Sequence, residues 1–345
     1  MHPAKKILGR IGRCFSIPQL LSISGKQLLL PFYHVVSNER LPHIINLYQY
    51  RNVAGFEADL DALLQYYQPI GLQELLTGGE EPKQATKPYF HLTFDDGLRE
   101  CAEVVAPILL RKGIPATFFL NSGFIDNRGL FYRYKVSLII EHIKKNEISH
   151  TELEAIGALM PEGARKLDKS KHVISLLLAL SYEHQFDINQ IADVFEIDFG
   201  NFLRQQKPYM TKVQIQQLIT EGFTVGAHSI DHPPYRKLEL IEQLEQTTES
   251  LRHINELFQV PYKVFAFPFT DYGVGKSFFE EMYHNGQRFV DLSFGTAGFK
   301  IEKYPRHLQR IAMEDGQEGA LQTIKEAYMG SIVQQALGLN RIKRD

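Results

Sequence analysis

The chain has no tryptophan, only two cysteines and no long apolar run, and each absence narrows its class. Cys14 and Cys101 are too few for a disulfide framework or for a zinc site built from cysteines. No segment approaches the roughly 20 consecutive apolar residues that a membrane-spanning helix needs. The net charge of −2 argues against a nucleic-acid partner, because proteins that bind the phosphate backbone of nucleic acids usually carry a basic patch or stripe.

The composition is that of a soluble globular protein with enough apolar residues for a core. Of the 345 residues, 44% are hydrophobic and 23% are charged. This length exceeds that of a typical single domain, but α/β barrels reach it as one domain. We therefore expect one catalytic domain over residues 1–345.

The N-terminal segment is basic and amphipathic. Its basic and apolar residues are Lys5, Lys6, Arg10 and Arg13, and Ile7, Leu8, Ile11 and Phe15. It lacks the apolar stretch and small-residue cleavage site of a secretory signal, which favours a cytoplasmic or membrane-peripheral location. Two interpretations remain open: a helix in peripheral contact with a membrane surface, or a helix packed across one end of the domain. We favour the second.

Strand-like runs alternate with segments of helical periodicity along the chain. We expect strands within residues 27–36, 89–94, 116–120, 223–227, 264–267, 289–294 and 308–313. We expect helices within residues 56–67, 98–112, 211–222 and 240–258. Repeated alternation predicts a parallel sheet, and this many repeats predict an α/β barrel with its site at the carboxyl ends of the strands.

The stretch of about residues 127–207 interrupts this alternation. It has little strand signal and several helical patterns, which predict a helical insertion between two barrel strands. Long insertions beside barrel sites are often functional. The insertion is either a lid or substrate wall, or an appendage for solubility or dimer formation, and we weigh these hypotheses equally.

Two adjacent carboxylates follow the strand-like run that ends in TFDDG, residues 93–97. Asp95 and Asp96 would each lose water on burial, and each would raise the pKa of the other. A pair in this position indicates a bound cation or a proton-transfer task.

A matching pattern follows a later strand-like run as HSIDH, residues 228–232. His228 and His232 are four residues apart, which on a helical turn places both imidazoles on one face. With Asp96 as third ligand, the set would leave an open position on Zn²⁺, as in catalytic zinc sites. Asp95 would then be free to act as a general base.

TFDDG followed by HSxxH resembles the first two motifs of the polysaccharide deacetylase family, carbohydrate esterase family 4. The resemblance implies a distorted, incomplete (β/α) barrel. It also implies hydrolysis of acetyl groups from N- or O-acetylated glycans with a bound divalent metal. In the family's pattern Asp95 is the base, and Asp96, His228 and His232 are the metal ligands.

The third motif of the family reads Arg-x-Pro-Tyr/Phe, whereas this chain has AFPF at residues 266–269. The arginine that orients the base in the family is therefore absent from this position. Asp271 and Tyr272 are candidates to replace its polar function. The resemblance also implies that the backbone N–H of Phe269 serves as an oxyanion donor.

The last two motifs match loosely. Asp291 is a weak counterpart of the fourth motif's aspartate, and the tryptophan of that motif is missing. The fifth motif supplies a histidine as general acid, for which His307 and Glu314 are both candidates. His34 resembles the histidine of a Tyr-His pair on the first strand of many members, where it either lines the pocket or orients a neighbour.

The resulting hypothesis is a metal-dependent hydrolase, with Zn²⁺ as the expected metal and an acetylated glycan or glycan precursor as substrate. One alternative is a metal-dependent amidase that acts on a non-glycan substrate. Another is a catalytically impaired sugar-binding protein on the same barrel, which the missing arginine and the unassigned acid favour. The intact Asp95 opposes it, because a binding protein does not need a base.

Overall fold

Eight short parallel strands form the main sheet, which closes almost completely into a barrel. The computed structural model of the protein describes residues 12, 14–77, 87–159, 170–283, 289–314 and 319–345. The order across the sheet is β10 (His307–Gln309), β9 (Leu292–Gly295), β8 (Val264–Ala266), β7 (Thr224–Ala227), β6 (Ala116–Leu120), β5 (Leu92–Phe94), β2 (Pro31–Tyr33) and β11 (Ile311–Ala312). The predicted barrel is thus confirmed.

The last strand of the barrel joins both edges of the sheet. β10 pairs with β9 at one edge, and β11 pairs with β2 at the other. Only Arg310 separates β10 from β11 in sequence. The single strand predicted over residues 308–313 is therefore two short strands, because the chain bends at Arg310 to reach both edges.

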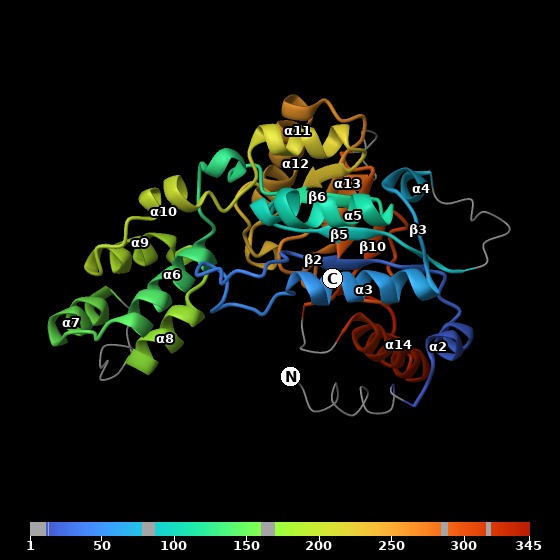
Figure 1. Ribbon diagram of the computed structural model, residues 1–345, viewed down its shortest axis with the longest axis horizontal. Helices are drawn as coiled ribbons and strands as arrows, with labels where there is room; N and C mark the ends of the chain where they lie inside the picture. The colour runs from blue at the N-terminus through green and yellow to red at the C-terminus, as the bar shows by residue number, and fades with distance from the viewer. Residues whose placement is uncertain (1–11, 13, 78–86, 160–169, 284–288, 315–318) are drawn as a thin grey trace. The chain divides into compact units, whose positions relative to one another are not determined.

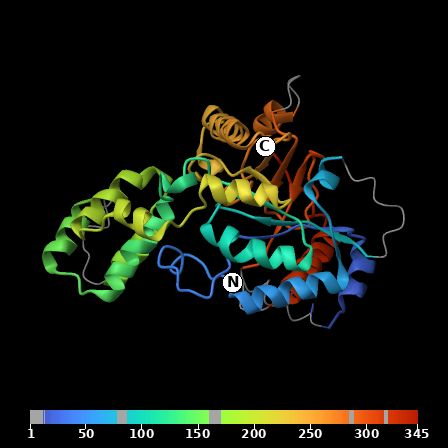
Figure 2. The same ribbon diagram turned by 45° about the horizontal axis from the view of Figure 1, so that its top comes forward.

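Helices cover the outer side of the sheet (Figures 1 and 2). They are α2 (Ile17–Ser24), α3 (Val53–Tyr66), α4 (Leu72–Leu76), α5 (Ala106–Lys112), α11 (Lys212–Thr220), α12 (Leu240–Phe258), α13 (Lys276–Tyr283) and α14 (Ala320–Ala336). α11 and α12 pack on β7, and α14 packs against α2 and α3. These helices bury the apolar outer face of the barrel.

Side chains alternate between the two faces of each strand. Phe119 and Val264 point into the barrel, whereas Phe118 and Phe265 belong to the larger core beneath the helices. Gly226 of β7 makes room for the interior layer. A Cβ there would lie 2.6 Å from the Phe119 ring and 2.7 Å from Val264. The small residue therefore lets a phenylalanine fill the barrel.

A second, three-stranded sheet lies at the amino ends of the barrel strands. It consists of β1 (Leu28–Leu29), β4 (Tyr89–Phe90) and β3 (Gln68–Pro69). The strand predicted over residues 89–94 is broken at His91, where the chain passes from β4 to β5. The His91 ring donates from Nδ1 to the Ile70 carbonyl at 2.8 Å, and its Nε2 accepts from the Thr117 hydroxyl at 2.9 Å. Burial lowers the pKa of His91 to about 4, so its imidazole is neutral.

Local sequence signals set most helix ends. Thr211 and Gln214 form the predicted capping box before α11. Gly113, with φ 64°, ends α5 as predicted. The helix predicted over 98–112 instead begins with a wide π turn, Cys101–Val105. Pro107 follows this turn and has no N–H to continue the ordinary pattern.

Residues 39–49 and 127–208 form a second compact unit. Its helices are α6 (Tyr132–Lys145), α7 (His150–Leu159), α8 (Ser170–Ala179), α9 (Gln185–Val194) and α10 (Phe199–Gln206). Ile139, Ile156, Val173 and Ile188 are fully buried in it. The helical nature of the insertion was predicted, whereas the participation of residues 39–49 was not. Its role as lid, substrate wall or appendage stays a prediction.

The basic N-terminal segment lies almost entirely outside the described residues, so both interpretations of it remain predictions. Within the described part of the chain, no helix combines the length and the apolar character needed to cross a membrane.

Candidate active site

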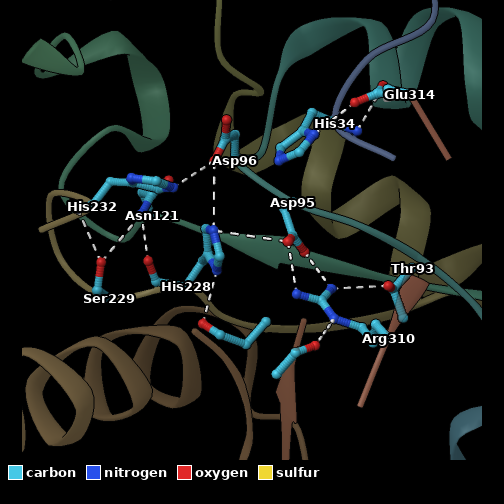
Figure 3. Close-up of polar contacts among 12 residues, drawn as sticks. His34, Thr93, Asp95, Asp96, Asn121, His228, Ser229, His232, Arg310 and Glu314 are labelled. Atoms are coloured by element: carbon cyan, nitrogen blue, oxygen red, sulfur yellow. Dashed lines mark hydrogen bonds and ion pairs between the residues drawn. The ribbon is translucent and has the colours of Figure 1, made fainter. Parts of the chain in front are cut away.

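The two aspartates lie directly after β5, at the carboxyl end of the strand. Asp95 and Asp96 are 2% and 4% exposed. The Asp95 N–H donates to the Tyr33 carbonyl at 3.0 Å, which continues the pairing of β5 with β2. Asp96 has a φ of 70°, in the left-handed region. The chain turns there, so that Asp95 faces Arg310 and Asp96 faces His232, while both carboxylates also lie near His228 (Figure 3).

The histidines lie in the loop after β7, which is not the helical turn that their spacing suggests. Ser229 and His232 have φ values of 70° and 65°, which are incompatible with a right-handed helix. The His232 N–H donates to the Ser229 hydroxyl at 3.0 Å and closes a tight turn. This turn brings the His228 and His232 rings to a centroid distance of 4.9 Å. The two imidazoles therefore meet, but through a different local structure.

The structure brings the three predicted metal ligands together. Asp96 Oδ1 lies 3.6 Å from His228 Nε2 and 3.2 Å from His232 Nε2 (Figure 3). One ligand atom from each residue lies within 4.8 Å of the others. Two imidazole nitrogens and a carboxylate oxygen are the donor set of a catalytic zinc site.

The protonation states of these residues fit a divalent cation. The Ala266 carbonyl lies 2.8 Å from His228 Nδ1, so this nitrogen carries the proton and Nε2 presents its lone pair toward Asp96. Burial lowers the pKa of His228 to about 4, which keeps the ring neutral. Burial acts to raise the pKa of Asp96, but the neighbouring His232 outweighs it and holds the pKa well below its usual range.

Arg310 is an ion-pair partner of Asp95. Its Nη1 and Nη2 donate to the two carboxylate oxygens of Asp95 at 2.7 and 2.8 Å (Figure 3). Arg310 is fully buried, bonds the Thr93 hydroxyl at 3.0 Å and stacks on Phe32 at 4.4 Å. Burial acts to raise the pKa of Asp95, but the guanidinium outweighs it and lowers the pKa. The carboxylate is therefore ionised and fixed in direction.

Sequence reasoning missed Arg310 because it looked for the arginine beside Pro268. One signal was available, since Arg310 is the only charged residue in the strand-like run 308–313. Leu308 and Arg310 fall on the same face of an extended chain. A charged residue on that interior face needs a buried counter-ion, and Asp95 is placed to be one.

Phe269 lies in a tight turn beside the metal-ligand candidates. The Thr270 N–H donates to the Pro268 carbonyl at 2.6 Å, and Phe269 between them has a φ of 55°. This γ-type turn is rare and strained for a residue with a Cβ. The Phe269 ring is 45% exposed and lies edge-on to His232, with the centroids 4.6 Å apart.

His34 and Glu314 form a pair on the side of the aspartates away from Arg310 (Figure 3). His34 Nδ1 lies 2.7 Å from Glu314 Oε2, and Glu314 Oε1 accepts the N–H groups of His34 and Val35 at 3.0 and 3.1 Å. Burial lowers the pKa of His34, but the Glu314 carboxylate, helped by Asp96 and Asp95, raises it to about 9. The side chain keeps 27% exposure, so a substrate can reach it.

His307 lies away from these groups. Its ring packs against Phe279 of α13 at a centroid distance of 4.9 Å, on the helix-facing side of β10. Its Nε2 lies 3.1 Å from Asp271 Oδ2. Arg310, three residues later, faces the barrel interior. Of the two candidates for the acid role, Glu314 is therefore the one at the site, where it partners His34.

The remaining candidates also lie in other surroundings. Asp271 is buried in the cluster with His307, whereas Tyr272 is 74% exposed. Asp291 exchanges hydrogen bonds of 2.8 Å with the backbone of Lys263, before β9 begins. This position is at the amino end of the sheet, opposite the site.

Comparison with known proteins identifies the family. The polysaccharide deacetylase family matches residues 83–177 and 187–280, which are more than half of the chain. The chain therefore belongs to the polysaccharide deacetylase family, and membership implies a hydrolase that acts on acetyl groups. The matched residues include the predicted site residues Asp95, Asp96, His228, His232 and Phe269. No curated protein matches the chain at a significant level.

Solved structures share the fold at low sequence identity. The chain is similar to the Streptococcus pyogenes deacetylase PplD in complex with acetate (12% identity, TM-score 0.54, covering 87% of this chain and 97% of that one). It is also similar to IcaB from Ammonifex degensii (15% identity, TM-score 0.52, 88% and 98%). A third is the putative polysaccharide deacetylase BA0330 from Bacillus anthracis (12% identity, TM-score 0.52, 88% and 69%).

Proposed function

We propose that this protein is a metal-dependent deacetylase that hydrolyses acetyl groups on a glycan or glycan precursor. The observation that carries the proposal is the convergence of Asp96, His228 and His232 beside a carboxylate, Asp95, that Arg310 holds by two hydrogen bonds. This constellation combines a metal donor set with a separately oriented base. The family gives the acetylated glycan as substrate class.

Asp96 and the two histidines would hold the cation, with Zn²⁺ as the expected metal. The hydrogen bond from His228 Nδ1 to the Ala266 carbonyl fixes the tautomer that such a ligand needs. A bound divalent ion supplies Lewis acidity, which activates water and polarises an acetyl carbonyl. The buried position of all three ligands excludes competing solvent from most of the site.

Asp95 is the proposed general base. Its Oδ2 lies 4.0 Å from His228 Nε2, so the base faces the same space as the ligands. The Arg310 guanidinium keeps the carboxylate ionised at neutral pH, and each oxygen retains a lone pair to accept a proton from the attacking water. Orientation by two parallel bonds limits the carboxylate to one direction of attack.

His34 is the proposed general acid, with Glu314 as the residue that orients it. The Glu314 carboxylate engages Nδ1, which leaves the opposite ring nitrogen, Nε2, as the proton donor to a leaving group. An amine leaves far less readily than an alkoxide without this proton. The pair therefore favours N-acetyl over O-acetyl groups as the substrate bond.

Phe269 is the proposed oxyanion donor through its backbone N–H. Support comes from the strained turn at φ 55° and from the Phe269 ring, which lies against the His232 ring. A donor fixed in advance stabilises charge that develops only in the transition state. Because the role belongs to the backbone, the side chain can serve as part of the wall of the site.

Two contacts in the structure count against the alternative of an impaired sugar-binding protein. It depended on the missing arginine and the unassigned acid, and Arg310 and the His34–Glu314 pair are candidates for these two roles. The amidase alternative differs only in the substrate, so a comparison of substrates separates it.

The test is acetate release from N-acetylglucosamine oligomers and from small N-acetyl amides, before and after chelation and zinc addition. We expect release from the oligomers that chelation abolishes and zinc restores. Release from the small amides alone would support the amidase. No release from any acetylated substrate by the zinc-loaded protein would contradict the proposal.

A further inference from the structure

Asp271 is the centre of a buried polar cluster that none of the proposed catalytic roles uses. It is 2% exposed and lies two residues after Phe269. Its carboxylate accepts hydrogen bonds from His307 Nε2 at 3.1 Å, Gln309 Nε2 at 2.9 Å, the Thr296 N–H at 3.0 Å and Arg344 at 2.5 Å. Four donors from three segments of the chain fix this one side chain, and two of them, His307 and Gln309, belong to β10.

Arg344 balances the charge of the cluster. Its side chain is 3% exposed, donates to the Glu302 carboxylate at 2.6 Å and stacks on the Phe279 ring at 4.2 Å. It also donates to the Asp271 backbone carbonyl at 2.7 Å. Burial acts to raise the pKa of Asp271, but His307 and Arg344 outweigh it and hold the pKa well below its usual range. Asp271 is thus a buried carboxylate that stays ionised through its partners.

The first connection from the cluster to the site runs through the loop after β8. Arg344 holds both the side chain and the carbonyl of Asp271, so the loop is anchored directly after the turn at Phe269. A residue with φ 55° persists only where its surroundings determine it. The anchor at Asp271 is such a constraint, and the Phe269 ring at this turn lies 4.6 Å from the His232 ring, centroid to centroid.

The second connection runs through Gly295 at the end of β9. A Cβ on Gly295 would lie 2.5 Å from Asp271 Cγ and 2.5 Å from Gln309 Oε1, so the carboxylate packs directly on the backbone. The Gly295 carbonyl accepts the Arg310 N–H at 3.1 Å and Arg310 Nε at 3.3 Å. The same cluster therefore seats the guanidinium that holds Asp95.

We propose that Asp271, clamped by Arg344, is a positioning residue for the deacetylation site. It fixes the Phe269 turn over His232 and, through Gly295, the direction of Arg310. The kinetic part of this inference rests on the proposed function. Its structural part concerns the order of the Phe269 turn and stands independently of the reaction.

A fluorescence reporter tests the structural part. The chain has no tryptophan, so Phe269→Trp provides a unique probe in the turn. In this background Arg344→Gln should raise the acrylamide quenching constant of the probe. The matched control is Glu302→Gln, which changes the other partner of Arg344 and leaves its bonds to Asp271 in place. Equal quenching in both variants would overturn the inference.

Kinetics on the chain with Phe269 intact test the second part. Arg344→Gln should lower kcat by roughly 10-fold or more, which is the usual effect of removing a residue that holds a reacting group in place. The zinc content should be unchanged. Arg344→Lys should recover part of kcat, because it keeps the charge without the planar fork. Glu302→Gln should leave kcat near the wild-type value even where it lowers the melting temperature. A fall in stability with no fall in kcat in Arg344→Gln would show a merely structural role.

Asp271→Asn provides the test if Arg344→Gln fails to fold. The amide keeps the volume and accepts from Thr296, but it loses the ion pair with Arg344. We expect lower kcat and, in the Phe269→Trp background, higher quenching of the tryptophan probe, and unchanged values of both would overturn the inference. If even the wild-type protein releases no acetate, the proposed function fails, whereas the quenching comparison still decides the positioning role.

Discussion

Arg310 and Asp95 form a fully buried ion pair with two parallel hydrogen bonds of 2.7 and 2.8 Å. The pair joins the bend of the last strand to the end of β5, at the place where the barrel closes. Arg310 keeps the proposed base ionised and oriented from a position 44 residues beyond Ala266, where the family's motif has its arginine. The arginine that pairs with Asp95 therefore comes from the bend between β10 and β11 rather than from the motif beside Pro268.

Removal of the arginine should destabilise the fold strongly. Arg310→Met leaves the Asp95 charge buried without its partner, which costs about 3–5 kcal/mol of unfolding free energy. Urea denaturation measures this loss. The double variant Asp95→Asn with Arg310→Met should recover part of it, because the uncompensated charge is gone. An Arg310→Met protein as stable as the wild type would show that the pair is not what neutralises Asp95.

The loss of activity on substitution of His34 or Glu314 should depend on the leaving group of the substrate. With an N-acetyl glycan, His34→Asn should lower kcat on the order of 100-fold or more, and Glu314→Gln should lower it less, because the amine must be protonated as it leaves. With 4-nitrophenyl acetate, whose leaving group needs no proton, both variants should keep most of their activity.

Tyr33→Phe is the matched control for this comparison. Tyr33 precedes His34, but its hydroxyl donates to Asp59 of α3 at 3.1 Å, on the helix-covered side of the sheet. The control should show the wild-type ratio of activities on the two substrates. Equal losses on amide and activated ester in His34→Asn would contradict the assignment of His34 as the acid.

His91 should make the stability of the protein depend on pH. Its folded pKa of about 4 lies below its ordinary value of 6.5, so between these values the unfolded chain binds a proton that the folded protein does not. Stability should therefore fall as the pH drops from about 6.5 toward 4, by about 3 kcal/mol from this residue alone.

Denaturation midpoints of the wild type and His91→Gln across this pH range measure the effect. The variant should have the shallower slope, and His228, which also has a lowered pKa, contributes equally to both proteins and cancels in the difference. Identical slopes would contradict a neutral, buried His91.

Much of the barrel could be predicted because buried parallel strands are continuous apolar runs. The strand predicted at 116–120 matches β6, and the long helix predicted from Leu240 to Phe258 has the bounds of α12. Capping signals such as Thr211 and Gln214 act within one turn of helix, so they can be recognised locally. Asp95, Asp96 and the two histidines stood out because costly polar groups followed apolar strands.

The features that were missed depend on contacts distant in sequence. The partnership of Arg310 with Asp95 spans 215 residues, and the strand bend that enables it appears only when the barrel closes. The turn at His228–His232 could not be inferred from spacing alone, since a four-residue separation suits both a helix and a loop with positive φ values. His34 acquired a role only through Glu314, which lies 280 residues away.

The central claim is that the adjacent aspartates divide the chemistry, with Asp96 binding the metal and Asp95 moving the proton. Zinc content and acetate release, measured together on Asp95→Asn and Asp96→Asn, test it most directly. We predict that Asp95→Asn keeps the wild-type zinc content but loses roughly 100-fold or more of its acetate release, whereas Asp96→Asn loses both. Wild-type zinc content and acetate release in Asp96→Asn would contradict the account.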